Sequence, residues 1–106
     1  MIDEKRLSKA LTYMAETDEP CAELKADMER AEFMAKATKD AIFMRLDGTV
    51  AERAAQAGSH EEYAGAMGVY FGNLKRFEAM RNKRQTESLI VDVWRSLNSS
   101  RNKGNL

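Results

Sequence analysis

The sequence predicts an all-α protein, a long antiparallel helical hairpin with a short connecting helix and an N-terminal helix packed alongside. The 106 residues are rich in the helix-favouring Ala, Glu, Lys, Arg, Met and Leu and include a single proline. Apolar residues recur at intervals of three and four, and no stretch alternates like a β-strand. We predict one domain over residues 1–98 and a flexible polar tail at 99–106.

The N-terminal helix is predicted over residues 3–15. Its apolar positions follow helical spacing and are Leu7, Ala10, Leu11 and Met14. The run Thr17-Asp18-Glu19-Pro20 then interrupts the chain, because Thr17 or Asp18 can cap a second helix and Pro20 suits its first turn.

The second helix is predicted over residues 20–46, with two apolar faces. One face keeps a heptad-like spacing and consists of Leu24, Met28, Ala31, Ala35, Thr38 and Ile42. The other face consists of Phe33, Met34, Ala37, Ala41 and Met44. We therefore expect the later half of this helix to be covered on two sides. Gly48 ends it, because glycine readily takes the left-handed conformation that follows a helix.

Two capping boxes predict the remaining helices. Thr49-Val50-Ala51-Glu52 starts a short helix over 50–57, and Ser59-His60-Glu61-Glu62 starts a long one. The apolar face of the long helix begins with Tyr63, Met67, Tyr70, Phe71, Leu74 and Phe77. Gly65, Gly68 and Gly72 each cost a helix roughly 0.5–1 kcal/mol relative to alanine. They predict either close approach of another backbone or a break at Gly72-Asn73.

The segment from Asn82 to Leu97 carries the main hypothesis about function. Residues 81–88 contain no apolar side chain, and a new apolar stripe then consists of Leu89, Ile90, Val93, Trp94 and Leu97. At roughly 100° per residue, this stripe lies on the order of 150° around the helix from the earlier face. Either the helix bends or restarts near Thr86, or a straight helix presents opposite faces to different neighbours. The second neighbour is then the N-terminal helix or another chain.

The net charge is zero, but the charges are unevenly distributed. Nine Lys and Arg stand against fourteen Asp and Glu up to residue 74, and eight stand against three from residue 75 onward. This basic C-terminal third indicates internal pairing, a solvated helix face or an anionic partner. The candidate nucleic-acid or partner contacts are Arg81, Lys83, Arg84, Arg95, Arg101 and Lys103.

The sequence does not indicate an enzyme. His60 begins a helix and has no second His or Cys at metal-ligand spacing, so we interpret it as a helix-start polar residue. Cys21, the one cysteine, has acidic neighbours that oppose thiolate formation. We expect no cofactor, metal or small-molecule substrate. We also expect no membrane segment and a cytoplasmic location.

Three segments resemble a group of small helical proteins of tailed phages and prophages, of the kind encoded near phage recombination and replication genes. They are ETDEPCAELKADMERAE (16–32), GTVAERAAQA (48–57) and NKRQTESLIVDVWRSLNSSRNKGN (82–105). No catalytic or binding residues are assigned in that group, so none carries over. The resemblance implies an accessory role in DNA recombination or replication. It also implies a location in the cytoplasm of the host cell if the chain is phage-encoded.

Three functional hypotheses follow. The first is a non-enzymatic phage-type accessory protein that acts on DNA, a nucleoprotein or a host protein. The alternative is a protein-interaction module, an inhibitor or adaptor of a host protein, that uses the Leu89–Leu97 stripe without touching nucleic acid. The third is a self-assembling structural protein. We also expect a dimer, because the stripe requires a cover.

Overall fold

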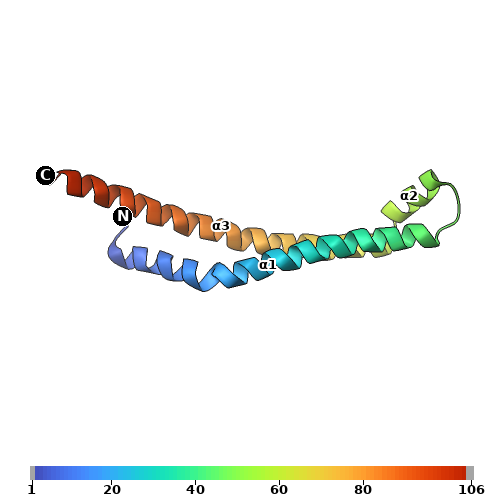
Figure 1. Ribbon diagram of the computed structural model, residues 1–106, viewed down its shortest axis with the longest axis horizontal. Coiled ribbons are helices and arrows are strands. Elements are labelled where there is room, and N and C mark those ends of the chain that lie inside the picture. The colour runs from blue at the N-terminus through green and yellow to red at the C-terminus, as the bar shows by residue number, and fades with distance from the viewer. Residues whose placement is uncertain (1, 105–106) are drawn as a thin grey trace. The chain divides into compact units, whose positions relative to one another are not determined.

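The computed structural model describes residues 2–104, and their side chains up to Asn102. The helices are α1 (Glu4–Arg45), α2 (Val50–Gly58) and α3 (Glu61–Gly104), as Figure 1 shows, with no strand among the described residues. The predicted fold class is confirmed: α1 packs against α3, and the short α2 lies between them in the sequence.

The chain divides into two compact units. Unit 1 combines Met1–Ala22 with Glu78–Leu106, and unit 2 is Glu23–Phe77. Each unit therefore holds one segment of α1 and one segment of α3, and α2 belongs to unit 2. Residues 99–104, predicted as a polar tail, continue α3 as helix.

The N-terminal segment is helical as predicted, but the interruption predicted at Thr17–Pro20 is absent, because α1 passes through Pro20. Proline removes one helical hydrogen bond, here the one that the Glu16 carbonyl would accept. Arg84 of α3 does not contact that carbonyl, but it binds the turn before the proline. Its guanidinium donates to the Met14 carbonyl at 2.9 Å, the Thr17 hydroxyl at 2.6 Å and the Asp18 carboxylate at 2.9 Å.

The core of unit 2 follows the predicted heptad spacing. Ala31, Ala35 and Ile42 are buried on α1, and the other predicted seam positions of α1 are half-buried. The apolar residues of α3 in this unit are half-buried as well. They are Tyr63, Met67, Tyr70, Leu74 and Phe77. Phe71, which was predicted on this face, is exposed. Ile42 is the largest fully buried side chain described, so this core is small.

The prediction that the later half of α1 is covered on two sides is wrong within this chain. Phe33, Met34 and Met44 are among the exposed large apolar side chains. The helix α2 lies against a different flank of α1, where Arg53 donates to the Phe43 carbonyl at 3.0 and 3.1 Å and stacks over the Phe43 ring. The second apolar face of α1 therefore has no cover among the described residues of its unit.

The predicted start of α2 is confirmed. Thr49 is its N-cap, and the Thr49 hydroxyl accepts from the Glu52 amide at 3.2 Å. Gly48 has a φ of 119°, the left-handed conformation expected there. The second capping box does not form, because Ser59 instead caps the C-terminus of α2 through the Ala55 and Ala57 carbonyls. At the start of α3, His60 Nδ1 accepts from the Glu62 amide at 3.1 Å.

The glycines of α3 do not mark a close approach inside the chain. A Cβ atom added at Gly65, Gly68 or Gly72 would meet nothing within 4 Å. The alternative of a helix break at Gly72-Asn73 is also wrong, since α3 is continuous there. The cost of these glycines is therefore not offset by any packing that the described residues provide.

Candidate functional site

The helix α3 is continuous through Thr86, so the alternative of a restart there is wrong. Six of its covered positions in unit 1 keep the spacing of three and four residues and are Met80, Arg84, Glu87, Val91, Trp94 and Asn98, and Glu78 and Ile90 are half-buried beside them. The polar run 81–88 therefore does not interrupt the packing. It contributes Arg84 and Glu87 to the interface with α1, where apolar residues would normally stand.

An ion pair fills the interface at Glu87. Arg6 Nη2 donates to the two carboxylate oxygens of Glu87 at 2.7 and 2.8 Å, and the Glu87 side chain is only 11% exposed. Nearby, the ammonium group of Lys83 lies 4.6 Å from the centre of the Tyr13 ring. On α1 the neighbouring covered positions are Leu7, Ala10 and Met14, whereas Leu11, predicted on the same face, is exposed.

The apolar stripe predicted to face away from the hairpin divides into two parts. Ile90 and Trp94 are half-buried and belong to the packing of unit 1. The predicted offset is therefore wrong for Trp94, which continues the covered row in steps of three and four residues. Leu89, Val93 and Leu97 are 61%, 40% and 45% exposed, respectively. These three residues, at i, i+4 and i+8, form a continuous apolar row on one side of the helix. We call them the Leu89 row.

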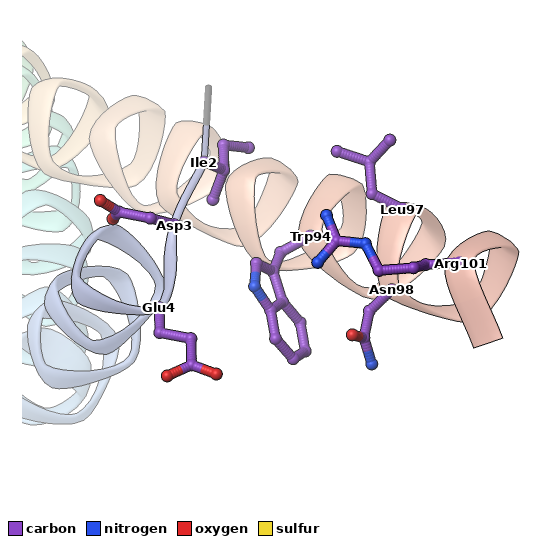
Figure 2. A pocket seen from close by; sticks show the side chains of 7 residues that line it. All are labelled: Ile2, Asp3, Glu4, Trp94, Leu97, Asn98 and Arg101. Carbon is purple, nitrogen blue, oxygen red and sulfur yellow. The ribbon is translucent and has the colours of Figure 1, made fainter. Parts of the chain in front are cut away.

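A hollow of about 420 Å³ lies at one end of the Leu89 row. It is lined by residues 2–4 and by Trp94, Leu97, Asn98 and Arg101. Figure 2 shows the Trp94 ring projecting from α3, with Glu4 on one side and Asn98 on the other, and with the Arg101 guanidinium turned toward the ring. The Trp94 hollow thus combines an aromatic wall with charged groups of both signs at its edge.

The six basic candidates are placed differently from one another. Arg84 is largely buried and is bound to α1, as described above. Arg81 and Arg95 lie 3.7 and 3.9 Å from the carboxylates three residues earlier, Glu78 and Asp92. Arg101 lines the Trp94 hollow. The side chain of Lys103 lies outside the described residues.

Unit 2 carries an exposed polar contact at the start of α3. Arg45 Nη2 donates to Glu62 Oε1 at 2.7 Å. This hydrogen bond, together with the charge of the guanidinium, holds the pKa of Glu62 below its ordinary value of 4.5. Among the described residues, no group of three or more His, Cys, Asp or Glu could hold a metal ion.

Neither the comparison with family models nor those with curated proteins and solved structures yields a match for this chain. Within the described residues, no helix combines the length and apolar character that crossing a bilayer requires. The case for a function therefore depends on the surfaces of the two units.

Proposed function

We propose that this chain is a protein-interaction module, an adaptor or inhibitor, whose Leu89 row and Trp94 hollow bind an amphipathic helix of a partner protein. The observation that carries the proposal is the exposure of Leu89, Val93 and Leu97 in one helical row. Fully burying such a side chain is favourable by about 1.5–3 kcal/mol relative to leaving it exposed. A partner helix that covers the row gains this free energy along two turns of α3.

The Trp94 hollow supplies an anchor point beside the row. Tryptophan in a partly enclosed site is the side chain most often found at the centre of strong protein interfaces. Because Leu97 belongs to the row and also lines the hollow, a helix lying on the row can insert one side chain against Trp94. The geometry thus fits one elongated apolar ligand.

The charges of unit 1 do not favour a partner of one sign. Residues 1–22 and 78–106 together carry nine Lys and Arg and eight Asp and Glu. Asp3, Glu4 and Arg101 line the Trp94 hollow, so both signs lie beside the binding surface. We therefore define the partner helix by its apolar positions alone.

A second candidate function is supported by two exposed arginines near the end of α3. A phage-type accessory protein of DNA recombination or replication would bring phosphate groups against Arg95 and Arg101, which are exposed. Arg84 is a poor candidate for such a contact, because its guanidinium is bound to α1. We rank this function second, since it gives no role to the Leu89 row.

The test is a selection from a displayed library of helical peptides against the full chain, with Val93→Asp as counter-selection. We expect enriched peptides with an apolar heptad pattern. The matched control is Leu11→Asp, an exposed apolar position on α1 of the same unit, which should retain binding. Absence of enrichment, or peptides that bind Val93→Asp equally well, would contradict the proposal. Retardation of short DNA duplexes at low salt without peptide binding would favour the second candidate.

A further inference from the structure

We infer that unit 1 binds the phosphate backbone of a DNA duplex through a strip of lysines on α1 and α3. This lysine strip consists of Lys5 and Lys9 on α1 and Lys83 on α3, and all three side chains are exposed. The strip shares no residue with the Leu89 row or with the lining of the Trp94 hollow. The inference therefore goes beyond the function proposed above and names a second binding surface.

The lysine strip borders two hollows. A hollow of about 330 Å³ is lined by both helices, through Arg6, Lys9, Tyr13, Lys83 and Glu87. A second hollow of about 310 Å³ is lined by α1 alone, through Lys5, Ser8, Lys9, Thr12, Tyr13 and Glu16. Lys9 and Tyr13 line both hollows, so the two adjoin. Four cationic side chains and two carboxylates line the pair, and this local excess of positive charge carries the inference, because unit 1 as a whole is close to neutral.

Two ammonium groups at the first hollow have no carboxylate to neutralise them. Arg6 already binds both carboxylate oxygens of Glu87. The Lys83 ammonium instead lies 4.6 Å from the centre of the Tyr13 ring, on the side of Lys9 in the sense that both groups line the same hollow. Among the described residues, no carboxylate lies within ion-pair distance of Lys9 or Lys83. Like charges at one hollow repel each other, so an anion placed between them is stabilised by both.

The other side chains of the second hollow suit phosphate groups. The hydroxyl groups of Ser8, Thr12 and Tyr13 line it beside the lysines. Lysine and hydroxyl side chains are among the groups that contact phosphate oxygens in protein–DNA complexes. Lys5 and Lys9 lie one turn apart, roughly 6 Å along the helix axis, so each can contact a different phosphate group of one strand.

The composition of the strip favours a duplex over other polyanions. No aliphatic side chain lines either hollow, so the strip lacks the apolar face with which a helix enters a membrane surface. The Tyr13 ring is half-buried and carries the Lys83 ammonium over it, so it offers little area on which the bases of a single strand could stack. Lysines act as point charges on phosphates and do not read base edges in the paired manner of arginine. We therefore expect binding to a duplex without sequence preference.

Fluorescence anisotropy of a labelled duplex of mixed sequence, titrated with the full chain at several salt concentrations, tests the inference. The logarithm of the binding constant should fall with the logarithm of the salt concentration with a slope of roughly −3, at about 0.9 per phosphate contact. Lys5→Gln, Lys9→Gln and Lys83→Gln should each weaken binding and reduce the magnitude of this slope by about 1. Their helical circular dichroism should not change, because the three side chains are exposed.

The matched control is Lys36→Gln, which removes the same charge from an exposed lysine of α1 in unit 2 and should leave the slope unchanged. Absence of duplex binding at low salt, or a slope that Lys9→Gln leaves unchanged, would overturn the inference. Binding to a phosphorylated peptide or to anionic vesicles, without binding to the duplex, would overturn it as well.

Two further variants separate this inference from the functions proposed above. Loss of duplex binding in Arg95→Gln and Arg101→Gln, with normal binding in the lysine variants, would place the phosphates on the end of α3 and contradict the inference. Val93→Asp should bind the duplex as the unmodified chain does, because Val93 belongs to the Leu89 row. Failure of peptide binding would therefore leave the lysine strip standing, and failure of duplex binding would leave the helix-binding function standing.

Discussion

Arg6 and Glu87 form a forked ion pair in the interface between α1 and α3 of unit 1. The Arg6 Nη2 atom lies 2.7 and 2.8 Å from the two carboxylate oxygens of Glu87. The two side chains differ in their access to water, at 35% exposure for Arg6 and 11% for Glu87. Removing Arg6 and removing Glu87 should therefore change the free energy of unfolding by different amounts.

We predict that Arg6→Ala destabilises the protein more than Glu87→Ala does. Removing Arg6 leaves a buried carboxylate without its partner, whereas the Arg6 guanidinium left by Glu87→Ala can be hydrated. We expect a loss of about 2–3 kcal/mol in the free energy of unfolding for Arg6→Ala and about 1 kcal/mol less for Glu87→Ala. Urea titrations at one fixed protein concentration measure both. Arg95→Ala, which breaks the exposed pair with Asp92, is the control and should cost at most about 0.5 kcal/mol.

Arg84 should be irreplaceable by lysine. A lysine ammonium cannot reproduce the fork that joins the Met14 carbonyl, Thr17 hydroxyl and Asp18 carboxylate. We expect Arg84→Lys to lower the free energy of unfolding by about 1–2 kcal/mol. Hydrogen exchange should accelerate first in the turn before Pro20. Unchanged exchange in that turn would show that Arg84 does not support the proline-containing part of α1.

Gly68→Ala should stabilise the chain. The position is helical, and an added Cβ meets no atom within 4 Å, so the helix gains about 0.5–1 kcal/mol without a clash. Gly48→Ala is the matched opposite case, because φ is 119° there and the new Cβ would lie 2.8 Å from the Glu52 carboxylate. The midpoint temperature of thermal unfolding should rise for Gly68→Ala and fall for Gly48→Ala. A lower midpoint for Gly68→Ala would indicate that the position is already occupied by a neighbour.

The ion pair between Arg45 and Glu62 predicts a pH dependence. The pKa of Glu62 is lowered from 4.5, first by the hydrogen bond from Arg45 and then by its charge. A carboxyl group whose pKa is lowered on folding stabilises the folded state above its ordinary pKa. The contribution is lost as the pH falls through the folded-state value. A carbon NMR titration should find the pKa of Glu62 below 4.5, and Arg45→Ala should return it toward 4.5. Equal pKa values of Glu62 in the unmodified protein and in Arg45→Ala would contradict the assignment of the shift to Arg45.

The fold of unit 2 could be predicted because its interface is apolar. The spacing from Leu24 to Ile42 identified the buried side of α1 directly, and the structure confirms it. The second apolar face has the same composition but no neighbour among the described residues. Hydrophobic periodicity indicates that a helix face is apolar, but it does not indicate which chain covers that face.

The packing of unit 1 could not be predicted from apolar periodicity. Arg84 and Glu87 occupy interface positions, so the pattern of apolar residues stops between Met80 and Leu89. Counting on by three and four residues from Phe77 would have reached Arg84, Glu87 and Trp94. At Pro20 the error was the opposite one, because local propensity favours a helix start there, whereas α1 continues through it with Arg84 bound to the preceding turn.

The Trp94 emission spectrum tests the proposed interaction most directly, because Trp94 is the only tryptophan and lines the hollow beside Leu97. The full chain is titrated with an amphipathic helical peptide from the selection. We predict a saturable blue shift that is absent in Val93→Asp and retained in Leu11→Asp. An unchanged spectrum with a peptide that binds, or the same shift in Val93→Asp, would contradict the account.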